Sequence, residues 1–314
     1  MILIASALWV PPLMIRRYKS GRKPRRPTPP RPAGPRQPYP SDLTDDQWAL
    51  IRPLLSTNAG AGRPPTTDFR EVVDAVFYLL REGCTWRALP HDFPPWGTVQ
   101  DYFYRWCRDG TWQRIHDALR DQARAAGERN PQPTAAAIDS QSVQTTEVGG
   151  TKGFDAGKKV KGRKRHLLVD RMGLLLAVVV HSAGVQDCRG AEQVLMDIEK
   201  KYPELEVVWA DGSYRRTCLR DWVTARGVGW RLEVVERPPG SKGFAVQPQR
   251  WVVERTFGWL NRYRRLSKDY ERRTGTSEAL IQLTMIHIMV RRLEPAFQNH
   301  LASPVGDPIV TQAA

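Results

Sequence analysis

The sequence predicts an α/β protein in which a small all-helical part precedes a mixed β-sheet with flanking helices. Two observations support this prediction: apolar residues recur at helical spacing up to residue 126, and β-rich runs appear from residue 134 onward. The first β-rich runs form a hairpin, whereas the later ones alternate with helical segments, which favours a mixed sheet. The chain has 314 residues, of which 41% are apolar, so it is long enough to bury a sizeable core.

Proline and charge divide the chain into segments. Residues 1–41 hold nine Lys or Arg, ten prolines and no acid, and such a segment cannot bury enough apolar surface to fold. We therefore expect a disordered, basic, Pro-rich arm over 1–40 and a short tail over 297–314. Between them we expect a helical domain over 41–130 and a sheet domain over 131–296.

The formal net charge of +15 makes nucleic acid or an anionic membrane the first partners to consider, rather than small anions. Residues 42–133 carry a net charge of −2, and residues 134–314 carry +8. Residues 1–15 are apolar, but a spanning helix needs about 20 such residues and two prolines interrupt this run. The four scattered cysteines indicate neither a metal site nor a disulfide framework. We expect a cytoplasmic, nucleoid-associated protein without a membrane partner.

The helical part has recognisable ends. Thr44 and Gln47 have the spacing of a capping box, and a second helix is predicted over 68–81, ending at Gly83. A short helical piece near 85–89 and helices over 98–109 and 111–126 follow. This pattern suits a helix-turn-helix bundle that reads DNA, although the negative charge of this part also fits a plain packed cap. The candidate recognition helix would direct three polar side chains to DNA, namely Gln100, Arg105 and Arg108.

The second half predicts strands first and then alternation. A short buried strand ends at Asp139, and the runs KRHLLVD and LLLAVVVHS form a hairpin through the turn at 171–173. A helix over 190–201, a strand ending at Asp211, a helix over 214–226 and a strand over 228–235 come next. Helices over 250–265 and 277–293 close the chain. This is the element order of a ribonuclease-H-like mixed sheet with flanking helices.

Three carboxylates stand out against this fold. Asp139 and Asp211 each follow a short apolar strand, and sites in open α/β sheets form at the carboxyl ends of strands. Glu254 lies on the face of a predicted helix beside the apolar stripe, with Gly258 one turn away leaving space next to it. Taken singly, each acid also fits a turn, a cap or a surface ion pair with Arg250. As a set they are the candidate catalytic and metal-binding residues.

Three carboxylates amid so much positive charge suit two-metal chemistry at a phosphodiester. Two Mg²⁺ ions, for which Mn²⁺ can substitute, activate a water or a 3′-hydroxyl and stabilise the leaving oxygen. Carboxylate oxygens are the ligands that Mg²⁺ prefers. Two basic clusters would hold the DNA, although a solvated surface is the plainer interpretation of either one. Their candidate DNA-binding residues are Lys158, Lys159, Lys161, Arg163, Lys164 and Arg165, then Arg250, Arg255, Arg262 and Arg265.

Several motifs resemble one known family. The runs AAAIDSQSV, GKKVKGRKRHLLVD, WADGSY and RWVVERTFGWLNRYRRLSKDYE look like those of bacterial insertion-sequence transposases of the DDE type, in the insertion-sequence-five group. The runs LTDDQWALIRPLL and FPPWGTVQDYFYRW resemble the amino-terminal helical region of that family. The resemblance covers about 39–295 and implies a ribonuclease-H-like catalytic domain, Mg²⁺, and movement of a DNA element whose ends the protein binds.

The resemblance also assigns roles to residues. It makes Asp139 and Asp211 the two catalytic aspartates and Glu254 the catalytic glutamate, with Arg250 as the arginine four residues before it. Gln247 stands where the family signature has a tyrosine, and the basic residue expected at 261 falls at Arg262. Asp187 also matches a family position, although it fits a helix N-cap as well. His166 and His181 lie within strand patterns and are expected to be packed.

The leading hypothesis is a transposase that binds terminal inverted repeats, cleaves phosphodiesters at the element ends and joins the 3′-hydroxyl to target DNA. Its partners would be double-stranded DNA at the ends and the target, and pairing two ends implies a homodimer or larger assembly. A nuclease of the same fold without strand joining is one alternative. A catalytically inactive or domesticated DNA-binding regulator is another, and a peripheral membrane protein is a distant third.

Overall fold

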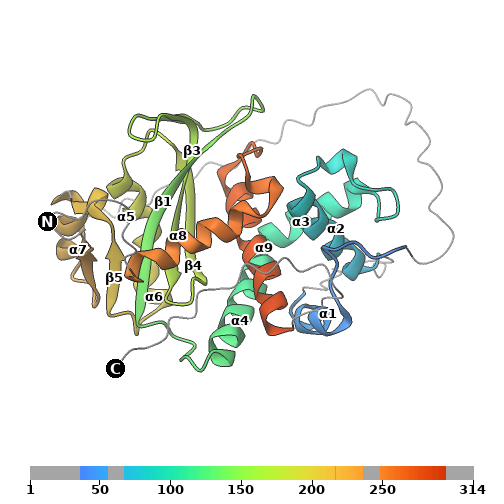
Figure 1. Cartoon of the computed structure of the whole chain (residues 1–314), viewed down its shortest axis with the longest axis horizontal. Helices are drawn as coiled ribbons and strands as arrows, with labels where there is room; N and C mark the ends of the chain where they lie inside the picture. The colour runs from blue at the N-terminus through green and yellow to red at the C-terminus, as the bar shows by residue number, and fades with distance from the viewer. Residues whose placement is uncertain (1–35, 56–66, 216, 236–247, 295–314) are drawn as a thin grey trace, which may run out of the picture. The chain divides into compact units, whose positions relative to one another are not determined.

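The computed structural model describes residues 36–55, 67–215, 217–235 and 248–294 (Figure 1). Residues 1–35 of the predicted basic arm and the predicted tail therefore lie outside the described residues. The last five residues of the predicted arm are described and packed, since Arg36 pairs with Asp42 and Glu71 and the Tyr39 ring stacks on Phe93, which corrects the expectation of disorder up to residue 40. Cys188 is disulfide-bonded, although the spacing of the cysteines indicated no disulfide framework, whereas Cys84 and Cys107 are free thiols. Within the described ranges, the structure has no helix that is both long and apolar enough to cross a membrane.

The helical part consists of α1 (Asp45–Ile51), α2 (Phe69–Glu82), α3 (Trp96–Arg108) and α4 (Thr111–Ala126), with 3₁₀ turns at Arg52–Leu54 and Trp86–Ala88. The capping box is confirmed, since Thr44 Oγ1 accepts from the Gln47 N–H at 3.2 Å and Gln47 Oε1 accepts from the Thr44 N–H at 3.2 Å. Gly83 ends α2 in the left-handed region, with φ +72°, which favours glycine. The predicted helix starts and stops therefore hold in this part.

Six strands form one mixed sheet. They are β1 (Ala135–Gln144), β2 (Gly153–Asp155), β3 (Val160–Asp170), β4 (Leu175–Ser182), β5 (Val207–Ala210) and β6 (Arg231–Val234). The order is β2-β3-β1-β5-β6, with β4 also paired to β3. Strand β3 is antiparallel to both β1 and β4, whereas β5 runs parallel to β1 and to β6. The predicted ribonuclease-H-like mixed sheet is confirmed.

The helices of the second half are α5 (Asp187–Leu195), α6 (Ile198–Lys201), α7 (Thr217–Arg226), α8 (Pro248–Asn261) and α9 (Thr274–Leu293), with 3₁₀ turns at Gly212–Arg215 and Arg264–Leu266. The helix predicted over 190–201 is divided into α5 and α6 at Asp197, because aspartate favours caps and turns over helix interiors. The helix predicted over 250–265 ends at Asn261 and continues as the second 3₁₀ turn.

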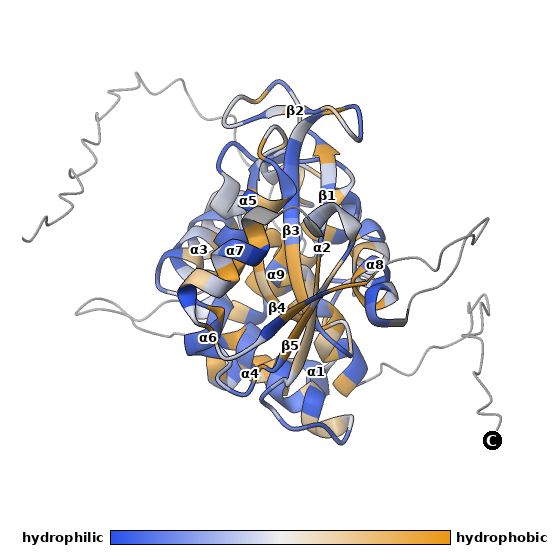
Figure 2. Ribbon diagram, turned by 90° about the vertical axis from the view of Figure 1, so that its left-hand side faces the viewer, coloured by the Kyte–Doolittle hydropathy of each residue, from blue (hydrophilic) through white to orange (hydrophobic). Residues whose placement is uncertain are grey.

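Two hydrophobic cores cover the two faces of the sheet. Ala136 and Ile138 of β1 pack with α5 and α7, whereas Ala137 packs with α8, α9 and the helical part. Helix α9 contacts β4, α4 and α2, so it lies between the sheet and the helical part (Figure 1). In Figure 2, β3 changes from hydrophilic at one end to hydrophobic where it crosses these cores. Helices α1–α4 thus share a hydrophobic core with α8 and α9.

Candidate active site

Asp139 lies within β1, next to the carboxyl end of the parallel strand β5. Residues Ala135–Ala137 pair with Val207–Trp209, and Asp211 follows β5 directly. Strand β1 does not end at Asp139 as predicted, because residues up to Gln144 continue the antiparallel ladder with β3. The alternation of a strand places Asp139 on the face covered by α8 and Ser140 on the opposite face, covered by α5.

The surroundings of Asp139 disfavour its charged form. Burial raises the pKa of this carboxyl to about 6, and the negative charge of Asp211 acts in the same direction. The Ser140 N–H, which donates to Asp139 Oδ1 at 2.7 Å, and the charges of Lys158 and Arg250 only partly offset the rise. Asp139 and Asp211 are therefore electrostatic neighbours in the folded chain.

Arg250 of α8 joins the other two predicted acids. Its Nη2 atom lies 3.6 Å from Asp211 Oδ2 and 3.3 Å from Glu254 Oε1. Asp211 also accepts hydrogen bonds from the N–H of Ser213, at 2.8 Å, and from the Ser213 hydroxyl. The Glu254 side chain is 42% exposed, so it can leave the arginine at little cost. The fold thus brings all three acids to one edge of the sheet.

The donor chemistry of this edge fits divalent cations. Carboxylate oxygens are hard ligands that suit Mg²⁺, and a cation between Asp139 and Asp211 would relieve the repulsion that raises the pKa of Asp139. Among the described residues, however, no three His, Cys, Asp or Glu side chains are close enough together to hold a metal ion. Asp139 and Asp211 are placed to take a cation, whereas Glu254 would first exchange Arg250 for it.

The predicted DNA-binding residues fall into two groups. The exposed ones are Lys158, Lys159, Lys161, Arg105, Arg108 and Arg262, and the partly buried ones are Gln100, Arg250 and Arg255. Lys158–Lys161 belong to the turn between β2 and β3 and the start of β3, where Lys159 takes a φ of +54°. Arg105 and Arg108 lie at the carboxyl-terminal end of α3. These positions can reach a polyanion without rearrangement of the core.

The other four predicted DNA-binding residues are buried, which corrects the interpretation of the basic run in β3. Arg163 pairs with Asp269 at 3.0 Å, and Arg165 Nη1 donates to the Leu266 carbonyl at 2.8 Å. Burial lowers the pKa of Arg165 to about 10. Lys164 pairs with Asp187, and Arg265 of the second 3₁₀ turn pairs with Glu271. Arg163, Lys164 and Arg165 hold the sheet to its covering elements, Arg265 holds the 3₁₀ turn to Glu271 and the Cys84 carbonyl, and all four are buried away from the surface.

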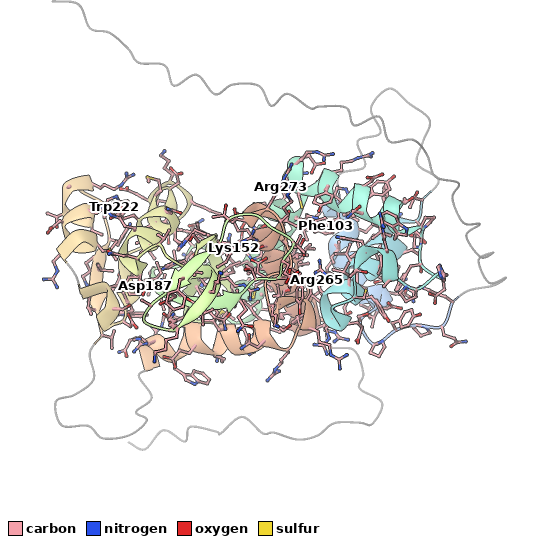
Figure 3. All side chains as sticks on the ribbon, turned by 90° about the horizontal axis from the view of Figure 1, so that it is seen from above. Phe103, Lys152, Asp187, Trp222, Arg265 and Arg273 are labelled. Carbon is pink, nitrogen blue, oxygen red and sulfur yellow. The ribbon has the colours of Figure 1, made fainter. Side chains whose placement is uncertain are left out.

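Asp187, the secondary candidate from the sequence, makes several contacts in the structure. The structure makes it the first residue of α5, where its Oδ1 atom accepts from Ser140 Oγ at 2.9 Å and pairs with Lys164 Nζ at 2.9 Å. Burial acts to raise its pKa, but Lys164 outweighs burial and the pKa is lowered. His166 and His181 are buried as expected, with ring nitrogens 2.8 Å apart. Figure 3 shows Asp187 in the sheet part of the molecule and Arg265 nearer to the helices.

A cavity of about 480 Å³ adjoins this edge of the sheet. Lys164 and Asp187 contribute to one wall, and Gly212 and Ser213, which follow Asp211, contribute to another. Phe154 of β2 lies at the cavity with its side chain 57% exposed. The cavity lies on the α5 side of the sheet, and its lining reaches the site only at Gly212 and Ser213, next to Asp211.

Comparison with known proteins agrees with this geometry. The family described as "Transposase DDE domain" matches residues 130–289, and the one described as "Putative transposase of IS4/5 family" matches residues 43–116. A "Putative transposase for insertion sequence element IS402" of Burkholderia cepacia is 32% identical over 152 residues, which cover 44% of this chain and 67% of that protein. An uncharacterized 16.2 kDa protein of insertion element IS402, also of Burkholderia cepacia, is 29% identical over 118 residues, covering 34% of this chain and 76% of that protein.

The family match spans β1 to α9, which is the part of the chain that carries all three acids and the whole sheet. The match to the IS4/5 group covers helices α1 to α3 and the start of α4. Family and geometry together indicate a nucleic-acid-processing enzyme of DNA transposition with a ribonuclease-H-like core. The chain belongs to the DDE transposase family of insertion sequences.

Proposed function

We propose that this protein binds the terminal inverted repeats of an insertion sequence, cleaves phosphodiester bonds at its ends with Mg²⁺ and joins the 3′-hydroxyl to target DNA. One observation carries the proposal. Asp139 and Asp211 are neighbours on adjacent parallel strands, and Arg250 links Asp211 to Glu254. A set of carboxylates at one edge of an open α/β sheet is what phosphodiester chemistry with hard cations requires.

In this proposal Asp139, Asp211 and Glu254 would hold the metal, which would supply an activated oxygen nucleophile and stabilise the leaving oxygen. Ser213 orients the Asp211 carboxylate through its N–H, and the Ser140 N–H orients that of Asp139. Arg250, once released by Glu254, is placed to contact a phosphate beside the acids. The pKa of Asp139, although raised to about 6 by burial, stays below neutral pH, so most of this carboxyl is ionised there and able to bind a cation.

Exposed cations on both parts of the chain would hold the DNA. Lys159 and Lys161 are exposed in the β2–β3 turn and at the start of β3, and Arg105 and Arg108 are exposed on α3, whereas the ammonium of Lys158 is bound to Ser140. Because α3 and the sheet belong to one shared core, DNA bound by the helices would keep a fixed position relative to the acids. Cutting and joining two ends in one event calls for two copies of the active site, so we propose a homodimer or larger assembly on DNA.

The test uses the full chain and DNA that flanks its coding region, with Mg²⁺ and Mn²⁺ supplied separately. We expect Asp139→Asn to lose strand cleavage and to keep end binding, because the amide preserves the shape but loses the charge that holds the metal. Asp197→Asn makes the same chemical change at an exposed site on the α5–α6 junction and should cleave normally.

Three outcomes would contradict the proposal in different ways. Cleavage by Asp139→Asn at the rate of the unaltered protein would show that Asp139 does not bind the metal. Cleavage without joined products would favour a nuclease. End binding by the unaltered protein with no cleavage in either metal would favour a DNA-binding regulator.

A further inference from the structure

A chain of polar side chains lies behind Asp139, on the opposite face of β1. We propose that Asp187 is a positioning residue which, through the Ser140 side chain, holds the part of β1 that carries the metal-binding carboxylate of Asp139. The inference rests on the proposed function, because it gives Asp187 a task only if Asp139 binds a metal. It adds Asp187, Ser140 and Lys164 to the working parts of the site without making any of them a metal ligand.

The contacts run without a break from α5 to Asp139. Asp187 Oδ1 accepts from Ser140 Oγ at 2.9 Å, and the Ser140 N–H donates to Asp139 Oδ1 at 2.7 Å. Lys158 Nζ donates to the Ser140 carbonyl at 2.6 Å and lies 3.2 Å from its hydroxyl oxygen. The hydroxyl, the N–H and the carbonyl of Ser140 are thus all in use. Its position along β1 is fixed from three directions.

Asp187 is itself held by a buried lysine. Lys164 of β3 is only 4% exposed, and its ammonium lies 2.9 Å from Asp187 Oδ1 and 3.4 Å from Asp155 Oδ2. It also donates to the Val185 carbonyl at 3.0 Å. A buried ammonium needs such partners, since an unpaired one costs several kcal/mol. Asp187 is therefore held by two contacts, the ion pair with Lys164 and the hydrogen bond from the Ser140 hydroxyl.

Asp155, the other acid that contacts Lys164, also has hydrogen-bond partners. Asp155, at the end of β2, accepts from Ser142 Oγ at 2.5 Å and from the Lys158 N–H at 3.0 Å. Burial acts to raise the pKa of Asp155, but the Ser142 hydroxyl and Lys164 lower it to about 2, so this acid is ionised at neutral pH. The turn that presents Lys158 is thereby tied to the same lysine that holds Asp187.

Geometry separates this role from simple fold stabilisation. Because strand side chains alternate, Asp139 faces α8 and Ser140 faces α5, so Asp187 cannot touch a metal at Asp139 and acts only through the strand. Partners that orient metal ligands in this indirect way typically change metal affinity or activity 10- to 100-fold when they are removed. A purely structural contact would change unfolding without changing metal affinity.

The experiment measures Mn²⁺ binding to the DNA-free protein by electron paramagnetic resonance, together with thermal unfolding and strand cleavage. We expect Ser140→Ala and Asp187→Asn each to weaken Mn²⁺ binding by about tenfold while end binding stays unchanged. Ser140→Ala keeps the N–H to Asp139 and leaves Lys164 paired, so it remains informative if Asp187→Asn unfolds. The double variant should lose no more Mn²⁺ affinity than the single variant that binds Mn²⁺ less tightly, because both substitutions break the same Ser140–Asp187 hydrogen bond.

Asp197→Asn serves as the matched control and should bind Mn²⁺ like the unaltered protein. Unaltered Mn²⁺ affinity in Ser140→Ala, with cleavage intact in the unaltered protein, would overturn the inference and leave the proposed function standing. Absence of Mn²⁺ binding and cleavage in the unaltered protein would instead overturn the proposed function. Additive losses in the double variant would show that the two residues act separately and would also overturn the inference.

Discussion

Arg250 Nη2 lies 3.6 Å from Asp211 Oδ2, so a cation of α8 already occupies the side of this acid that faces Glu254. A metal that binds here competes with the arginine. We expect Arg250→Gln to tighten Mn²⁺ binding to the DNA-free protein by about threefold to tenfold, because a positive charge close to the ligands is removed. DNA cleavage should fall in the same variant, since the phosphate loses its arginine.

Calorimetric titration with Mn²⁺ checks this expectation. Arg226→Gln, on the surface of α7, makes the same charge change away from the acids and should leave the affinity unaltered. Weaker Mn²⁺ binding in Arg250→Gln would mean that the arginine organises the acids instead of competing with the metal.

Surface lysines of the β2–β3 turn should contribute to DNA affinity through their charge alone. Lys159→Gln and Lys161→Gln are each expected to weaken binding at low salt and to reduce the slope of log affinity against log salt by about 1. Thermal stability should not change, because both side chains are exposed. Fluorescence anisotropy over a salt series measures the slope, and an unchanged slope would exclude a phosphate contact.

Arg163 should behave in the opposite way. Its guanidinium is fully buried and pairs with Asp269, which is 2% exposed. Arg163→Met leaves a buried carboxylate without its cation, and breaking such a pair costs about 3–5 kcal/mol of unfolding free energy. Chemical denaturation measures the loss, and Arg163→Met combined with Asp269→Asn should recover part of it. A salt slope reduced in Arg163→Met, with normal stability, would contradict the burial of this arginine.

We expect opposite effects on stability when a methyl group is added at two glycines. A Cβ at Gly190 of α5 would overlap ring atoms of His166 and His181, so Gly190→Ala should destabilise the fold by about 1–3 kcal/mol. A Cβ at Gly258 of α8 would meet nothing within 4 Å, and Gly258→Ala should stabilise the helix by about 0.5–1 kcal/mol. If the open space beside Glu254 receives DNA, Gly258→Ala should nevertheless weaken end binding. Unfolding curves and binding curves of the two variants test both statements.

Asp74 should make the fold less stable as the pH rises. Burial raises the pKa of this carboxyl from 3.8 to about 7 in the folded protein, so the folded state binds more protons than the unfolded one between these values. The stability contributed by the protonated acid is present below the unfolded pKa and is lost as pH rises through about 7. Asp74→Asn cannot ionise, so the difference in melting temperature between the unaltered protein and this variant should change over that range. A constant difference would contradict the raised pKa.

Local patterns in the sequence were enough for the element order, and they single out the three candidate acids. The capping box at Thr44, the left-handed stop at Gly83 and the hairpin around Gly173 each depend on neighbouring residues, so short-range rules predict them. Asp139 and Asp211 were found because they follow buried apolar runs. The bounds of β1 and of α8 were less predictable, because ladder pairing with β3 extends the one and a 3₁₀ turn replaces the end of the other.

The basic run in β3 shows what local patterns leave open. A strand's alternation tells which residues share a face, but it does not tell what covers that face. Arg163 and Arg165 face α9 and the second 3₁₀ turn, and Lys164 faces α5, so three predicted DNA contacts became buried ion pairs and hydrogen bonds. Only Lys158, Lys159 and Lys161, ahead of the covered part, stay at the surface.

The sequence by itself determined the fold class, the three candidate acids and the family motifs, because each is a property of neighbouring residues. Tertiary structure decided which cations are free to meet DNA, that the helices and the sheet share one core, and that Asp187 engages Ser140. These features depend on contacts between residues far apart in the sequence, such as Arg163 and Asp269, which are more than a hundred positions apart. Burial of a charge is set by such distant partners, and no local pattern records them.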